Sequence, residues 1–177
     1  MGTYGVEHII DFTGHRCIGS CTEDITEKET ESFTRLWSDV SNWPLGRLPA
    51  EGEDVHIMSG WNMTMDLEET PIYRLVRVNG ILNFKKDIDI HFKAKHIFVR
   101  AGEFNIGSKE SPYEKNCKIG LFGEKNAKGI VYDNAIEAGN KLIANTNKLN
   151  LYGKKRTKNW TRLLAPADHG ATDITVE

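Results

Sequence analysis

Residues 79–84 read NGILNF, residues 101–106 read AGEFNI and residues 146–151 read TNKLNL. Each copy has a turn-forming pair, one further residue, and then an asparagine between two apolar residues. The first two copies begin 22 residues apart, and the third begins 45 residues later, about two such periods. Residues 60–65, GWNMTM, are a looser copy upstream. A period near 20 residues, built from short strands and glycine turns, is typical of a β-solenoid.

The repeat therefore predicts an all-β fold, a right-handed parallel β-helix (β-solenoid). Its asparagines Asn83, Asn105 and Asn150 recur at one position of the coil. Two interpretations are open: their side chains stack into a ladder, or they are separate polar residues that face outward beside turns.

A turn-rich segment with two tryptophans precedes these copies. Residues 36–60 read LWSDVSNWPLGRLPAEGEDVHIMSG. Proline and glycine at this density mark turns, and the alternation at Val55 and Ile57 has the two-residue period of a strand. We expect the indoles of Trp37 and Trp43 to cap the open end of the solenoid.

One helix is expected near the N-terminus. Thr26 and Glu29 form a capping box, and Phe33, Leu36 and Trp37 follow at helical spacing. We therefore divide the chain into an N-terminal extension at residues 1–36, with a strand, a cysteine loop and this helix, and a β-solenoid domain at residues 37–177.

Composition limits the classes of function. At 177 residues, with 39% hydrophobic and 27% charged residues, the chain has the composition of one globular domain. A net charge of −2 predicts no general attraction to nucleic acid or to anionic membranes, and no apolar run reaches the length of a membrane span. Because the chain opens abruptly and ends on a strand-like pattern, we expect it to be a segment of a longer protein.

The cysteines suggest a local disulfide. Cys17 and Cys21 are close enough in sequence to close a small loop. With His8 and His15 nearby, zinc is the alternative, but the spacing matches no standard zinc module. No metal site and no cofactor are predicted.

An ordered set of segments resembles the G8 domain, a family named for its glycines. The resemblance covers about four-fifths of the chain. The matching segments are residues 37–39 with 43, 52–57, 75–84, 96–107, 112–123, 149–155 and 160–163. The family glycines that it implies are Gly46, Gly52, Gly60, Gly80, Gly102, Gly107, Gly123 and Gly153.

The G8 domain is found in fibrocystin-like proteins and in cell-surface and secreted hyaluronan-degrading proteins. The resemblance implies an extracellular, non-catalytic module of a larger protein, which binds an anionic polysaccharide or another protein. Two alternatives stay open: a structural spacer that contacts neighbouring domains, and an accessory part of a hyaluronan-degrading enzyme.

The most suggestive surface for a ligand is a basic turn beside an aromatic residue. Cations next to an indole suit an acidic polysaccharide, because lysine and arginine pair with carboxylates while sugar faces stack on the ring. The alternative is a charged hairpin tip with the indole buried in the core. The candidate residues are Lys154, Lys155, Arg156, Lys158, Trp160 and Arg162.

No catalytic motif is recognisable. Asp87 and Asp89 lie two residues apart, so on a strand their carboxylates share one face at a separation within the glycosidase range. We interpret them as solubility residues. Asn62 and Asn159 lie in N-glycosylation sequons and become acceptor sites if the protein is extracellular.

Overall fold

The computed structural model describes residues 30–132, 136–155 and 160–177. In these ranges the protein is all-β, as the repeat predicts, with one short 3₁₀-helix, η2 (Val40–Asn42), and no α-helix. No helix there is long and apolar enough to span a membrane. The strands are β1 (Arg35–Leu36), β2 (Asp54–Ile57), β3 (Asn62–Met65), β4 (Tyr73–Val78), β5 (Ile81–Phe84), β6 (Ile90–Val99), β7 (Glu103–Ile106), β8 (Cys117–Leu121), β9 (Ile130–Tyr132), β10 (Ile136–Ala138), β11 (Leu142–Asn145) and β12 (Lys148–Leu151).

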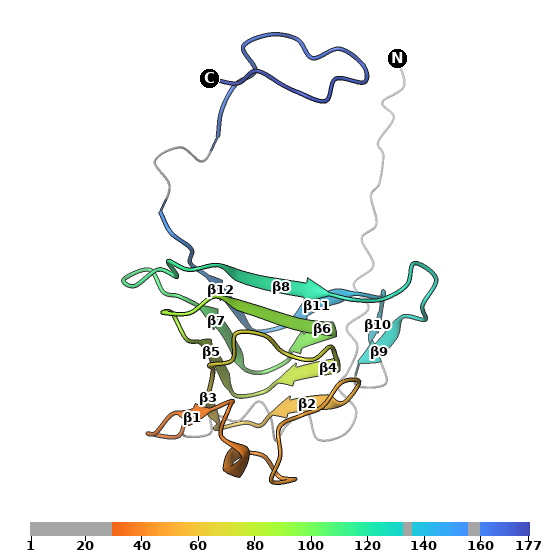
Figure 1. Cartoon of the computed structure of the whole chain (residues 1–177). Helices are drawn as coiled ribbons and strands as arrows, with labels where there is room; N and C mark the ends of the chain where they lie inside the picture. The colour runs from red at the N-terminus through yellow and green to blue at the C-terminus, as the bar shows by residue number, and fades with distance from the viewer. Residues whose placement is uncertain (1–29, 133–135, 156–159) are drawn as a thin grey trace, which may run out of the picture.

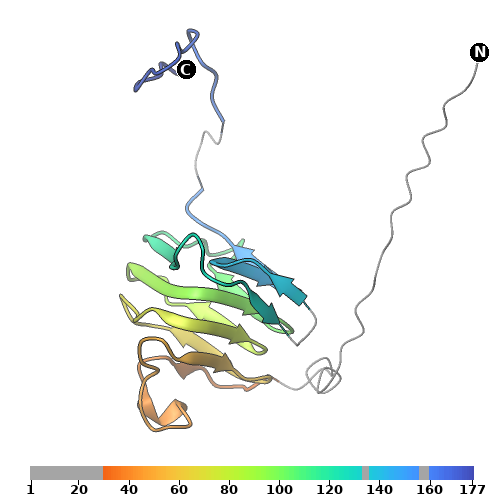
Figure 2. The same cartoon turned by 90° about the vertical axis from the view of Figure 1, so that its right-hand side faces the viewer.

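From β1 to β8, successive strands alternate between two parallel sheets. The first sheet has the order β1-β3-β5-β7-β12, and the second has the order β2-β4-β6-β11, with β8 also paired to β6. The sheets lie face to face as a stack of short strands (Figures 1 and 2). We call the end formed by β1, β2 and η2 the lower end, and the end formed by β8, β11 and β12 the upper end.

Register explains the sequence repeat. Phe104 is paired with Leu82 on one side and with Leu149 on the other, so the copies occupy equivalent places in the first sheet. Asn105 is likewise paired with Asn83 and Asn150. A repeat of about 22 residues is therefore the length of chain that leaves this sheet, adds a strand to the second sheet and returns.

The core lies between the two sheets. Strands β3, β5 and β7 each alternate half-buried and buried residues, which is the pattern of a strand with one face in the core. Met63, Leu82 and Phe104 are buried there in one column of the first sheet, opposite Val76 and Ile97 of the second. In the copies at residues 79–84 and 101–106, the apolar residue on each side of the repeated asparagine is thus a core residue.

Two tryptophans close the lower end. Trp37 is fully buried, with its ring 4.9 Å from Trp43 and 5.6 Å from Phe92, centroid to centroid. The indole N–H of Trp43 donates to the backbone oxygen of Trp37 at 2.8 Å. The turn-rich segment between them, with η2, brings the second indole back over the first, which agrees with the cap expected from the sequence.

The described part of the expected N-terminal helix is not helical. Residues 35–36 form β1, which pairs with Met63 and Thr64 of β3. The Arg35 guanidinium binds the Glu31 carboxylate at 2.5 Å and lies 4.7 Å from the centroid of the Trp61 ring. Pairing with a sheet edge and this cation–π contact outweigh local helix propensity, which is a weak determinant beside tertiary contacts. Residues 1–29, with Thr26 and Glu29, lie outside the described ranges.

A hairpin of β9 and β10 covers part of the outer face of the second sheet. The two strands pair antiparallel, and the Tyr132 ring lies 4.3 Å from that of Phe98, centroid to centroid. Two histidines lie on the same sheet: His96 is 9% exposed, and the His56 ring nitrogen is 3.1 Å from the Asn79 amide. Burial, helped by neighbouring cations, lowers the pKa of both imidazoles.

These histidines predict a loss of stability in mild acid. In the unfolded chain a histidine has a pKa near ~6.5. Because folding lowers that pKa, the unfolded state binds more protons below it, and stability falls as the pH drops through this value toward the lowered ones. We expect the midpoint of urea unfolding to be lower at pH 5.5 than at pH 7.5. The double variant His56→Gln/His96→Gln should lose most of this difference, whereas the exposed His169→Gln should keep it; equal pH dependence in all three would contradict the assignment.

A candidate ligand-binding groove over an asparagine ladder

The repeated asparagines form a ladder on the outer face of the first sheet. The side-chain amide of Asn150 donates to the oxygen of Asn105 at 2.8 Å, and that of Asn105 donates to Asn83 at 3.1 Å. Asn83 donates in turn to Asn62 at 3.0 Å, and Asn62 donates to the Thr34 hydroxyl at 3.4 Å. The ladder interpretation of the three repeated asparagines is therefore confirmed, and the looser copy adds a fourth member.

Parallel, in-register strands explain why asparagine suits this position. Neighbouring strands lie ~4.8 Å apart, and an amide side chain carries a donor and an acceptor at its end. Each amide can then accept from the strand above and donate to the strand below. The lowest step is irregular, because Thr64 holds the register position opposite Asn83 while Asn62 lies two residues earlier on the same face.

Removal of the middle rung should weaken the fold moderately. In Asn105→Ala, both the bond to Asn83 and the bond from Asn150 are lost, and two half-buried amides each lose a partner. We expect the free energy of unfolding to fall by ~1–2 kcal/mol, the usual cost of such a loss. Urea denaturation measures it, with Asn126→Ala in the exposed loop after β8 as the matched control. An unchanged unfolding midpoint in the Asn105 variant would show that the ladder does not stabilise the fold.

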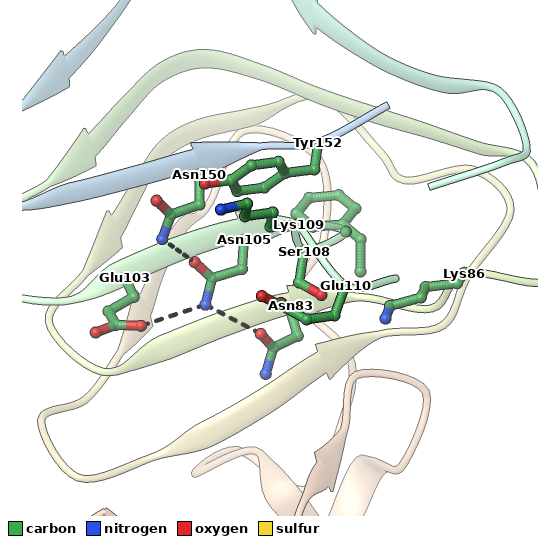
Figure 3. Close-up of a pocket in the computed structure, with 11 residues that line it drawn as sticks. Asn83, Lys86, Glu103, Asn105, Ser108, Lys109, Glu110, Asn150 and Tyr152 are labelled. Atoms are coloured by element: carbon green, nitrogen blue, oxygen red, sulfur yellow. Dashed lines mark hydrogen bonds between the residues drawn. The ribbon is translucent and has the colours of Figure 1, made fainter. Parts of the chain in front are cut away.

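A groove of about 570 Å³ lies over the upper part of the ladder (Figure 3). Gly107 turns the chain at a φ of 69°, and the following loop, residues 108–110, forms one wall. The loop is held by the Ser111 N–H, which donates to the Ser108 hydroxyl at 3.1 Å. The lining residues are Asn83, Phe84, Lys86, Glu103, Asn105, Gly107, Ser108, Lys109, Glu110, Asn150 and Tyr152.

Charge in the groove is mixed. Glu103 accepts from Lys148 at 2.5 Å, and this hydrogen bond, with desolvation acting against it, lowers the pKa of the Glu103 carboxyl. Lys86 and Lys109 bring two ammonium groups to the groove, and Glu110 brings a second carboxylate. The site thus combines a row of amides, two lysines, two carboxylates and the ring of Tyr152.

This set of groups can bind a polar ligand. Amides both donate to and accept from hydroxyl and acetamido groups, and lysines pair with carboxylates. A tyrosine ring offers a face on which an apolar sugar face can pack. Among the residues that the structure describes, no group of three or more His, Cys, Asp or Glu is arranged to hold a metal ion.

Asp87 and Asp89 do not form the expected carboxylate pair on a strand. Both lie in the turn between β5 and β6 rather than on a strand face. Asp89 accepts the Asn116 backbone N–H at 2.8 Å, which lowers the pKa of its carboxyl, and Asp87 lies 3.9 Å from the Lys85 ammonium. Asp89 therefore fastens the chain entering β8 to the chain entering β6.

The basic turn does not line the groove. Lys154 and Lys155 are exposed, whereas Arg156 and Lys158 lie outside the described residues. Trp160 is 65% exposed, so its indole is not part of the core between the two sheets. The Arg162 guanidinium lies 5.5 Å from the Trp160 ring centroid, the cation–aromatic pairing that the sequence suggests.

The modification sites stay predictions. Asn62 is half-buried in the ladder, and Asn159, Cys17 and Cys21 lie outside the described residues. Cys117 is a half-buried free thiol, and burial raises its pKa to about 11.

The family glycines differ in the structural constraint that each one meets. Gly46, Gly52, Gly60 and Gly107 have positive φ angles, which other residues rarely adopt. At Gly80 and Gly102 the constraint is space: a Cβ would lie 2.2 Å from the Met58 oxygen and 2.0 Å from the Gly80 oxygen, respectively. Around Gly153 there is open space, and a Cβ on Gly123 would meet the flexible side chain of Lys141.

The sequence repeat identifies the asparagines at the base of the groove but not the residues that form its sides. The asparagines were singled out by the repeat, whereas Lys86, Glu103, Tyr152 and the loop at residues 108–110 carry no pattern of their own. One usable signal was present: Gly107 directly follows a repeat copy, and the repeat then skips a period. A loop inserted at that point must leave the stack beside the ladder.

These features define a module of two stacked parallel β-sheets with a polar groove on one outer face. Residues 42–164 match the G8 domain family, and the chain belongs to this family.

Fibrocystin-type proteins are among the relatives. The chain is 28% identical over 148 residues to fibrocystin of Canis lupus familiaris, covering 82% of this chain and 4% of that protein. It is 27% identical over 139 residues to fibrocystin-L of Homo sapiens, covering 78% and 3%. The chain thus spans only a few per cent of the length of these relatives. No solved structure matches it.

Proposed function

We propose that this G8 domain is a non-catalytic ligand-binding module of a larger extracellular protein, and that its groove binds an anionic polysaccharide. The observation that carries the proposal is the groove itself: a row of amides beside a tyrosine ring and the ammonium groups of Lys86 and Lys109. The family resemblance supports the extracellular location.

The groove offers three kinds of contact that suit a polysaccharide chain. The side-chain oxygen of Asn150, at the top of the ladder, is placed to accept from an acetamido N–H or a hydroxyl of a sugar. Lys109 and Lys86 supply charge for uronic acid carboxylates, and Tyr152 supplies a ring face. A polysaccharide that alternates acetamido and acidic sugars would use all three kinds of contact.

The same proposal extends to the winding of the chain. Two parallel sheets fed by alternating strands are the faces of a short β-solenoid, and we propose that it is right-handed, because connections between parallel strands have this hand in nearly all proteins. Its outer faces are then free for a ligand while the core stays between the sheets.

Calorimetric titration tests the binding. The isolated chain should bind hyaluronan oligosaccharides with micromolar to millimolar affinity at low salt, more tightly than it binds a neutral glucan, and the affinity should fall as salt rises. The double variant Lys86→Ala/Lys109→Ala should weaken binding about tenfold, equivalent to ~1.4 kcal/mol.

A charge-matched control separates the two candidate surfaces. Lys154→Ala/Lys155→Ala also removes two positive charges, but from the basic turn, and should leave the affinity nearly unchanged. The opposite result, with the turn variant weakened and the groove variant intact, would place the ligand at the turn. No heat with any anionic glycan at low salt would refute the binding function.

A structural spacer is the second candidate. What favours it is the exposure of apolar side chains near both ends of the stack, with Leu45 at 73% near the lower end and Leu151 at 59% at the upper end. Apolar side chains at the ends of a stack suit contact with neighbouring protein segments where they form a contiguous patch. In that case the domain holds its neighbours at a fixed separation and needs no small ligand.

A further inference from the structure

The upper end of the stack is open, in contrast to the lower end. The interior columns of both sheets stop there at half-buried residues, among them Leu149 over Phe104 and Ile119 over Phe92. Leu151 is 59% exposed although Ile106, its partner one strand below, is only 8% exposed. Strands β8, β11 and β12 are the outermost strands at this end, so each presents a backbone edge. Open parallel edges above an apolar interior are features that proteins normally cover.

The C-terminal segment carries an apolar surface of its own. Within residues 160–177, Leu163 and Val176 form an antiparallel bridge, and Glu177 N–H donates to the Arg162 oxygen at 3.0 Å. The Thr161 hydroxyl also donates to the Glu177 oxygen at 3.0 Å, so the segment is a preformed hairpin. Its large apolar side chains are exposed: Trp160 65%, Leu163 55%, Leu164 63%, Ile174 62% and Val176 42%.

We propose that this C-terminal hairpin docks on the upper end and closes the stack there, as Trp37 and Trp43 close the lower end. The hairpin follows β12 directly in the chain. Only six residues, and so seven Cα-to-Cα steps, separate Gly153, next to Tyr113 at the upper end, from Trp160. At most ~3.6 Å per residue, they span up to roughly 25 Å, enough to bring the hairpin back over the strand ends.

Two further observations favour the hairpin as the occupant. The match to the G8 family continues to residue 164, so the first arm of the hairpin falls within the family domain. Charge is also complementary: in the hairpin Asp168, Asp173 and Glu177 outnumber Arg162, while β8 carries the exposed Lys118. Docking buries both apolar sets and brings opposite charges together.

Trp160 reports on the docking in the full-length chain. Its fluorescence is isolated as the difference between the parent chain and Trp160→Phe, and its access to water is measured by acrylamide quenching. We expect Trp160 to be shielded in the parent chain. Leu151→Lys at the upper end, or Leu163→Lys in the hairpin, should increase its quenching constant at least threefold. Because Leu151 and Leu163 are both exposed in the open arrangement, these changes leave the folded body intact, which circular dichroism checks.

The matched control is Leu45→Lys, which places the same charge on an exposed leucine near the opposite end and should leave Trp160 shielded. Full access of Trp160 to acrylamide in the parent chain, unchanged by Leu151→Lys, would overturn the proposal. Shielding that depends on protein concentration, with a dimer mass in sedimentation, would also overturn it, since the occupant would then be a second copy.

Discussion

Replacement of Trp37 by alanine should reduce the free energy of unfolding by ~3–5 kcal/mol, the range for a large aromatic residue removed from a core. The indole is fully buried and contacts the rings of Trp43, Tyr73 and Phe92. Its loss leaves a cavity under the cap, next to the Trp43 indole that packs on it. Urea denaturation followed by circular dichroism measures the effect.

The control for this substitution lies in the same region. Leu45→Ala removes an apolar side chain that is 73% exposed, so its effect on the unfolding free energy should stay within ~0.5 kcal/mol. A Trp37→Ala protein as stable as the Leu45→Ala protein would mean that the two indoles do not hold the lower end together.

Gly102→Ala should have the second large effect. A Cβ at residue 102 would lie 2.0 Å from the backbone oxygen of Gly80, the equivalent turn position one coil below. That oxygen accepts the Glu103 N–H at 2.9 Å, so it cannot move away without loss of a hydrogen bond between β5 and β7. We expect a cost above ~3 kcal/mol, at the upper end for overpacking, because backbone opposes backbone.

Gly153→Ala is the matched family glycine. Nothing lies within 4 Å of a Cβ at that position, and its φ is not positive, so alanine should be neutral or slightly stabilising through the unfolded chain. Thermal unfolding of the two variants side by side separates them. Similar losses at both sites would show that the family keeps its glycines for a reason other than the close approach of coils.

The parts of the fold that repeat were readable from the sequence. The apolar–Asn–apolar copies predict parallel strands, and register places Leu82 on Phe104 and Asn83 on Asn105 as such copies require. The ends of the stack do not repeat, so their structure was harder to predict. Phe33 and Leu36 suit a helix by spacing, but a neighbouring sheet edge makes a strand of residues 35–36, and a local pattern does not include that edge.

The same difference between repeated and unrepeated segments applies to the groove. Its asparagine floor repeats along the chain, so periodicity marks it, whereas Lys86, Lys109 and Tyr152 come from a turn, a loop and a strand exit. Whether these side chains lie close together depends on how far the loop at residues 108–110 extends over the sheet. Trp160 could not be assigned from the sequence, because an indole near cations fits both a core residue and a binding residue until its exposure is known.

The direction of the stack has a mechanical consequence. The chain enters the described body at β1, at the lower end, and leaves it after β12, at the upper end (Figure 1). Tension carried along such a chain would pull along the axis of the stack, so it would peel one strand from the next and load the backbone hydrogen bonds of a pair a few at a time. The asparagine side chains run along this same axis and add one bond at each of three junctions, β3–β5, β5–β7 and β7–β12. Under force, the asparagine ladder would resist separation of the coils together with the backbone hydrogen bonds. The domain would extend one coil at a time, starting from the open upper end.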